Sequence, residues 1–231
     1  MTLRGKGVSS QLIFSHDTEL TLRAACVLIN SDRVDGEQLA DMAALDEYLD
    51  GFGWTGRRDR DAAEMESVHR LRTRLGKIWT HADDEERVVG QVNALLSDTR
   101  AAPWLTRHVE MPEWHLHLAS IHDPLWQRMG AEMAMSLADL IRAGELRRLK
   151  TCAAPDCEAV LVDLSRNRSR MFCDTGNCGN RQHVAAYRER RASDERLREE
   201  PAGSDERLRE EPVGSDERLR EEPVGSDERL R

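Results

Sequence analysis

The sequence predicts a mainly α-helical fold: a multihelical N-terminal domain with a short β-hairpin, then a small zinc finger and a disordered repeat tail. Three observations support this. Apolar residues recur at helical spacing through most of the first two thirds of the chain. Four of the five cysteines lie close together near residue 165. The C-terminal end repeats one acidic unit. We therefore expect three parts, 11–148, 149–191 and 192–231.

Five segments of the N-terminal part are expected to form helices, because each has an apolar stripe between cap-forming residues. Asp17 or Thr18 is suited to cap the first of them. Asp123 is suited to cap the last, which has Pro124 in its first turn and closes at Gly144. The Met and Leu stripes predict a packed core rather than a cofactor-binding face. The segments are 19–30, 36–53, 60–79, 84–98 and 123–144.

Residues 104–118 alternate between apolar and polar side chains and predict a short hairpin that turns near Met111–Pro112. His115 and His117 would share one face of its second strand. Two histidines are not a full ligand set for a metal ion. We therefore favour an arrangement in which the histidines face solvent and Trp114, Leu116 and Leu118 face the core.

The sequence shows no segment near the ~20 apolar residues of a membrane span, and its N-terminus lacks the apolar region of a signal peptide. We therefore expect a cytoplasmic protein with reduced thiols and no membrane contact. An enzyme is not expected. His108-Val109-Glu110 matches the His-x-Glu of zinc deaminases, but the Pro-Cys-x-x-Cys of those enzymes is missing.

The four clustered cysteines follow the pattern Cys152-x4-Cys157-x15-Cys173-x4-Cys178. Two short pairs separated by a loop are typical of a structural zinc site, in which four thiolates fill a tetrahedron and leave no open position. The turn residues in "AAPD" and "DTGN" let each pair present two sulfurs to one ion. The cofactor prediction is therefore zinc. The fifth cysteine, Cys26, lies in an apolar helix and is expected in the core.

The zinc-binding segment is basic although the whole chain has a net charge of −9. Residues 146–191 contain ten Lys or Arg against five Asp or Glu, whereas both flanking regions are acidic. Such a local surplus of arginine beside Ser and Asn favours phosphate binding and indicates DNA as a partner. The candidate contacts are Arg166, Arg168 and Arg170 in the loop and Arg181, Arg188 and Arg191 on a following helix.

The tail consists of "SDERLREEPAG", two copies of "SDERLREEPVG" and a partial copy. A period of 11 can produce a right-handed coiled coil. Here each full unit contains one Leu and is interrupted by Pro and Gly, so no continuous seam forms. The composition predicts an acidic, disordered segment.

The segment "CAAPDCEAVLVDLSRNRSRMFCDTGNCGNRQHVAAYRERR" resembles the CGNR zinc finger, whose name is spelled by Cys178-Gly179-Asn180-Arg181. "FSHDTELTLRAACVLINS" and "AEMAMSLADLIRAGELRRLKTCAAPDC" resemble the ABATE domain that precedes this finger. The resemblance covers about 11–191. It implies a transcription regulator of the stress-induced type, with a mainly helical body and a treble-clef-like zinc module. It also implies that the four cysteines bind zinc and the arginines contact DNA.

Our prediction is a DNA-binding transcription regulator in which a structural zinc finger presents a basic loop and helix. The helical domain would bind a ligand, a protein partner or a second copy of the chain. Two other functions stay open. One is a protein-interaction module in which zinc only stabilises a docking surface. The other is a redox sensor whose thiolates release zinc on oxidation.

Overall fold

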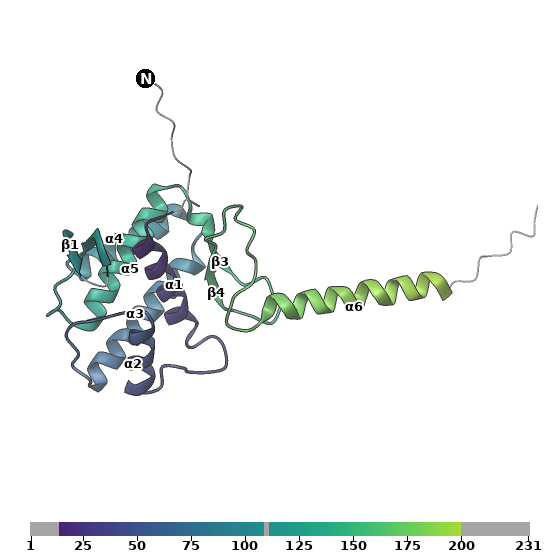
Figure 1. The fold of residues 1–231 in the computed structure, drawn as a ribbon, viewed down its shortest axis with the longest axis horizontal. Coiled ribbons are helices and arrows are strands. Elements are labelled where there is room, and N and C mark those ends of the chain that lie inside the picture. The colour runs from purple at the N-terminus through teal and green to yellow at the C-terminus, as the bar shows by residue number, and fades with distance from the viewer. Residues whose placement is uncertain (1–13, 109–110, 200–231) are drawn as a thin grey trace, which may run out of the picture. The chain divides into compact units, whose positions relative to one another are not determined.

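The structure, a computed structural model, describes residues 14–108 and 111–199 (Figure 1). It is mostly helical, with two short antiparallel strand pairs, and this confirms the predicted fold class. Within the described residues, no helix is long and apolar enough to cross a membrane. In chain order the elements are α1 His16–Asn30, α2 Met42–Gly51, α3 Ala62–Thr80, α4 Glu85–Asp98, β1 Trp104–His108, β2 Met111–His117, α5 Leu125–Arg142, a 3-10 turn Leu146–Arg148, β3 Leu149–Thr151, β4 Val160–Val162 and α6 Cys178–Glu199.

The helices begin where side chains satisfy the first free N–H groups. Asp41, Asp61 and Asp84 each accept a hydrogen bond from the backbone N–H three residues ahead. For α1 the cap is Ser15 and not Asp17 or Thr18, because the Ser15 hydroxyl accepts from the Thr18 N–H.

The start of α5 also differs from the prediction. Its N-cap position is Pro124, which makes no side-chain cap bond. The carboxylate of Asp123 instead accepts from the Ser120 N–H on the preceding turn. Gly144 ends the helix as predicted, with a φ of 66° that favours glycine.

The predicted helical stripes form the core. Helix α1 packs against α5 and α3, and α4 packs against α5. Leu75, Met129, Met133 and Leu137 are completely buried there. Each such side chain contributes roughly 1.5–3 kcal/mol of transfer free energy. Cys26 is also buried, as predicted.

The β1–β2 hairpin forms as predicted, but its turn and its facing differ. Met111 already pairs with His108, so Met111–Pro112 belongs to β2 and not to the turn. Residues 109 and 110, between the two strands, lie outside the described residues. The deaminase-like His-x-Glu motif includes both of them. Trp114 is 64% exposed and Leu116 is 36% exposed, so these two side chains do not enter the core, whereas Leu118 is buried as expected. A two-stranded hairpin can cover the body with either face, and alternation alone does not tell which.

The second strand pair, β3–β4, joins the helical core. Its register places Leu149 opposite Val162 and Thr151 opposite Val160. Leu149, Val160 and Val162 are buried in the same apolar cluster as α1, α3 and α5. The indole N–H of Trp79 on α3 donates to the carbonyl of Leu161 at 3.1 Å. The strands that carry the first cysteine pair are therefore anchored to the helices.

By contact density the chain divides into residues 1–187 and 188–231. Helix α6 runs across that division and reaches Glu199, past the expected start of the tail at residue 192. The first eight residues of the first repeat lack Pro and Gly, which explains why the helix extends into it. The remaining repeats, 200–231, lie outside the described residues, so the disorder expected for them is not addressed by the structure.

Candidate metal centre

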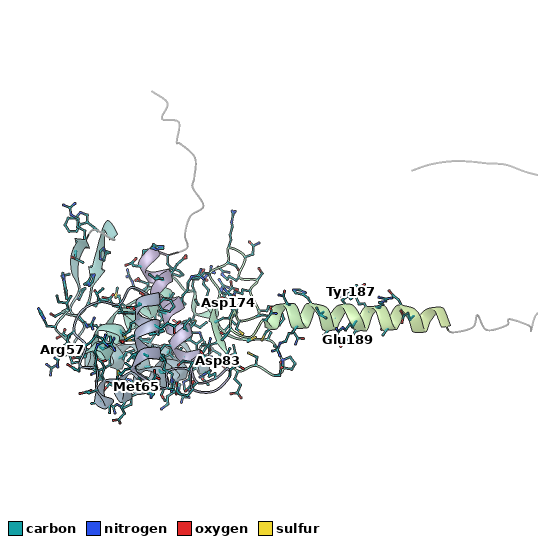
Figure 2. All side chains as sticks on the ribbon, turned by 60° about the horizontal axis from the view of Figure 1, so that its bottom comes forward. Arg57, Met65, Asp83, Asp174, Tyr187 and Glu189 are labelled. Carbon is teal, nitrogen blue, oxygen red and sulfur yellow. The ribbon has the colours of Figure 1, made fainter. Side chains whose placement is uncertain are left out.

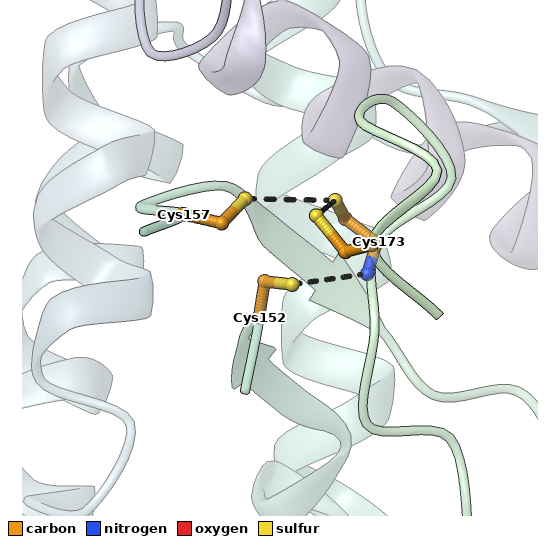
Figure 3. Close-up of side chains that lie close together, drawn as sticks. Cys152, Cys157 and Cys173 are labelled. Atoms are coloured by element: carbon orange, nitrogen blue, oxygen red, sulfur yellow. Dashed lines mark hydrogen bonds between the residues drawn. The ribbon is translucent and has the colours of Figure 1, made fainter. Parts of the chain in front are cut away.

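The four cysteines converge on one point. Cys152 follows β3, Cys157 precedes β4, Cys173 lies in the next loop and Cys178 begins α6. Their four sulfur atoms all lie within 4.8 Å of one another. The sulfurs of Cys157 and Cys173 are 3.7 Å apart, as are those of Cys173 and Cys178 (Figure 3).

This arrangement fits zinc. A tetrahedral ion with Zn–S bonds of about 2.3 Å separates its sulfurs by about 3.8 Å. Three of the cysteines are nearly or fully buried, Cys178 completely. Four converging thiols with no disulfide among them are the soft donor set of a closed, structural zinc site. When bound, the ion would hold together the segments that carry Cys152, Cys157, Cys173 and Cys178.

Two N–H groups donate to the sulfurs and support them. The backbone N–H of Cys173 donates to the Cys152 sulfur at 3.4 Å (Figure 3). The Arg181 guanidinium donates to the Cys178 sulfur at 3.2 Å and also binds the Asp156 carboxylate at 3.0 Å. Arg181 thereby holds the pKa of the Cys178 thiol below its ordinary value. Gly176 leaves room beside the site, because a Cβ there would lie 3.2 Å from the Cys178 sulfur, a tight contact.

A buried ion pair organises the loop between the cysteine pairs. Asp163 is completely buried, and its carboxylate accepts from the Lys150 ammonium at 2.6 Å. It also accepts from the N–H and hydroxyl of Ser165 and from the N–H of Arg170. Burial alone would raise the pKa of Asp163, but these bonds outweigh it and lower the pKa to about 2. Lys150 further donates to the carbonyls of Arg168 and Arg170.

Three of the six candidate arginines have partners within the fold. Arg168 binds Glu145 at 2.8 Å, Arg170 binds Asp174, and Arg181 binds Asp156. The sequence alone indicates Arg166, Arg168 and Arg170 as phosphate ligands in a loop and does not show what holds that loop. In the structure, the backbone of this loop is fixed by the Asp163–Lys150 pair, because that pair holds both the N–H and the carbonyl of Arg170.

The other three candidates are exposed. Among the described residues, Arg166 and Arg188 form no ion pair with a carboxylate. Arg191 pairs with Glu195 at 3.3 Å on the surface of α6, an interaction worth little in water. Large apolar side chains farther along α6 are also exposed: Val184 is 47% exposed and Tyr187, labelled in Figure 2, is 58% exposed.

The histidines form no comparable site. The Nε2 atoms of His115 and His117 lie 3.1 Å apart. In the part of the chain that the structure describes, the cysteine cluster is the only group of three or more His, Cys, Asp or Glu side chains close enough to share a metal ion. His183 is exposed on α6.

Sequence reasoning missed the supporting residues Arg148, Lys150 and Asp163. The Arg148 guanidinium donates to the carbonyls of Asp163 and Ser165 and fixes the start of the loop. No spacing rule connects these positions, because their contacts arise only when β3 and β4 pair. The one sequence signal is a pair of opposite charges next to apolar residues: Lys150 lies in β3 and Asp163 directly follows β4.

These features define a class of protein: a helical domain fused to a four-cysteine zinc finger. Residues 148–191 match the family model of the CGNR zinc finger. Residues 22–144, more than half of the chain, match the ABATE family, described as "Putative stress-induced transcription regulator". The chain belongs to the ABATE family and carries a CGNR zinc finger. A comparison with curated proteins finds no match.

Proposed function

We propose that the chain is a cytoplasmic, non-enzymatic transcription regulator that binds DNA through its zinc finger. The helical part, 11–148, would receive a signal, and the finger, 149–191, would contact DNA. Cys152, Cys157, Cys173 and Cys178 would hold one structural zinc ion. The observation that carries the proposal is the convergence of four sulfurs inside the one basic segment of an acidic chain.

The six candidate arginines fall into two groups, according to whether a carboxylate of the fold already pairs with them. Arg166 and Arg188 have no carboxylate partner among the described residues, and the Arg191 pair is exposed, so their charge is available to phosphates or base edges. Arg168, Arg170 and Arg181 already neutralise carboxylates and would contribute less. We therefore assign the strongest DNA contacts to Arg166, Arg188 and Arg191.

The test is a salt series of binding to genomic DNA fragments. For each phosphate contact, the slope of log affinity against log salt decreases in size by about one when the contact is removed. Arg188→Ala should reduce the slope or, at a base contact, cost ~1–3 kcal/mol on the preferred site only. Arg168→Ala is the matched control and should leave both quantities nearly unchanged.

The rival function is a docking module in which zinc only stabilises the surface. If zinc-loaded wild-type protein shows no salt-dependent DNA binding, this rival replaces our proposal. If Arg168→Ala and Arg188→Ala weaken DNA binding equally, the DNA-binding function stands but the division of roles among the arginines is wrong. Zinc content measured on every variant separates lost contacts from a lost fold.

A further inference from the structure

A cavity of about 210 Å³ lies in the helical part, between the first turn of α1, the β1–β2 hairpin and α5. Neither the zinc finger nor the predicted DNA contacts reach it. Its walls differ in chemistry. The two helices contribute three carboxylates beside Thr18, Thr21, Met135 and Ser136, and the hairpin contributes three large apolar side chains beside His115.

The acidic side contains Asp17 of α1 and Glu132 and Asp139 of α5. The Leu118 N–H donates to one oxygen of Glu132 at 3.2 Å, and the Thr18 hydroxyl donates to Asp139 at 3.2 Å. No Lys or Arg is among the described residues that line the cavity. Burial, opposed by the Leu118 bond and reinforced by Asp17, raises the pKa of Glu132 to about 7. A positive charge placed here would be stabilised.

Two guanidinium groups contact residues that line the cavity, one of them a carboxylate. Arg142 reaches Asp139 at 3.5 Å from a side chain that is 76% exposed. Arg107 stacks over the Trp114 ring at 4.9 Å. The second contact shows that this indole already binds a cation by its ring face.

The apolar side consists of Leu105, Trp114 and Leu116. Leu105 pairs with Leu116 across the hairpin, and Trp114 lies two residues before Leu116, so all three share one face. Leu105 and Trp114 are each 64% exposed although they border a cavity. Covering this surface would remove apolar area from water.

The geometry excludes a shared metal ion. The carboxylates of Asp17, Glu132 and Asp139 are too far apart to ligate one ion, since the described part of the chain brings only the four cysteines that close. The volume is below the roughly 300–1,000 Å³ of sites for drug-sized ligands. A small molecule that combines a positive charge with an apolar portion would match this lining.

We propose that this cavity binds a small organic cation, a primary amine with an apolar group. Its ammonium would lie on the side of the cavity that carries Asp17, Glu132 and Asp139 without contacting all three carboxylates at once, and its apolar group would lie against Leu105, Trp114 and Leu116. This site goes beyond DNA binding and does not depend on it. Helix α1 contributes Asp17 and Thr18 to the cavity at one end and contacts β4 of the zinc finger at the other.

The test is calorimetric titration of the full-length, zinc-loaded protein with phenethylamine. Binding is expected. Phenylacetate, which is negatively charged, and 2-phenylethanol, which is neutral, should bind at least about tenfold more weakly because each lacks the positive charge. Glu132→Gln keeps the size and the acceptor for the Leu118 N–H, and it should weaken phenethylamine by about tenfold or more. Trp114→Ala should also weaken it. Glu86→Gln, an exposed carboxylate on α4, is the matched control and should bind as wild type does.

Several outcomes overturn the proposal. It fails if phenethylamine gives no saturable heat up to about 10 mM, a range that covers weak metabolite sites. It also fails if phenylacetate binds equally well or if Glu132→Gln and Trp114→Ala both bind like wild type. A thermal melt of each variant shows whether it is folded. If Glu132→Gln does not fold, the affinities of Trp114→Ala and Glu86→Gln for phenethylamine are compared instead. Equal affinities would then overturn the proposal. The titration does not measure DNA binding, so this test remains valid even if the protein does not bind DNA.

Discussion

At the scale of single residues, Glu132 links stability to pH. The folded state raises its pKa from 4.5 to about 7, so the protonated form is favoured by folding. The free energy of unfolding that the raised pKa of Glu132 contributes is present at low pH and is lost as pH rises through about 7. Relative to Glu132→Gln, the wild type should lose up to about 3 kcal/mol between pH 5 and pH 8.5, since one pKa unit is worth about 1.4 kcal/mol.

Urea unfolding at both pH values measures this loss. Asp17, Asp139 and His115 also line the cavity, so the comparison must be with the Gln variant and not with wild type alone. Glu86→Gln, which changes an exposed carboxylate, should follow the wild-type pH profile. Parallel pH profiles for wild type and Glu132→Gln would contradict the assignment.

Asp163 should be the most sensitive position of the loop that carries the arginines. Its depressed pKa means that its contribution is fully present above about pH 4 and is lost as pH falls through about 2. Asp163→Asn leaves the Lys150 ammonium without a charged partner and should cost about 2–4 kcal/mol of unfolding free energy in zinc-loaded protein. Asp174→Asn, an 84% exposed carboxylate paired with Arg170, should cost less than about 1 kcal/mol. If urea unfolding shows equal losses of unfolding free energy for the two variants, the buried Asp163–Lys150 pair contributes no more than an exposed pair.

These residues show what could be predicted from the sequence at this scale. The cysteines were predictable because ligand spacing along the chain reflects the geometry around the ion. Lys150 and Asp163 were not, because they meet only through strand pairing. Arg168 was expected to be free for DNA, but a glutamate 23 residues earlier in the chain, Glu145, pairs with it.

At the scale of elements, the helices were predictable because apolar spacing determines which side of each is buried. Their first residues were less so. Ser15 and Asp17 are both good caps, and only the backbone angles of the folded chain select Ser15. For the hairpin, the alternation predicted the strands but not the face that covers the body.

The contact between α1 and β4 should be a sensitive junction. Asn30, the last residue of α1, accepts from the Val160 N–H at 2.7 Å and donates to the Val160 carbonyl at 2.9 Å. Both groups are buried, so Asn30→Ala leaves two unsatisfied backbone atoms and should cost about 2–4 kcal/mol. Val27→Ala changes an exposed side chain of the same helix and should cost less than about 0.5 kcal/mol.

Hydrogen exchange provides the measurement for this junction. The Val160 amide should lose protection in Asn30→Ala and keep it in Val27→Ala. Unchanged protection of that amide in both variants would mean that strand pairing alone holds β4 in place.

At the scale of the whole molecule, the change in charge near residue 148 suggests separate parts, yet the core continues across that position. Leu149, Val160 and Val162 belong to the same buried cluster as the helices, and residues up to Tyr187 form one compact unit. Sequence composition records charge and cysteine content, which change there. It does not record the packing of β3 and β4 against α1 and α3, which depends on the folded arrangement.

This shared core predicts that zinc supports more than the finger. Removing the ion with a chelator should release β3 and β4, because metal binding is coupled to folding in such sites. The helices would then lose their contacts with Leu149, Val160 and Val162, at roughly 1.5–3 kcal/mol for each buried side chain. The thermal transition of the helical part should fall by at least about 10 °C. Trp79 should become more exposed, since its indole N–H would lose the Leu161 carbonyl.

Circular dichroism melts, tryptophan fluorescence and elemental analysis on the same samples test this prediction. Cys157→Ser should reproduce the effect of the chelator, and adding the chelator to that variant should change nothing further, because both act through one ion. Restoring zinc should recover the wild type but not Cys157→Ser. If zinc-free protein, verified by elemental analysis, keeps the wild-type transition and fluorescence, the helices do not depend on the finger. The buried contacts of β3 and β4 would then persist without the metal.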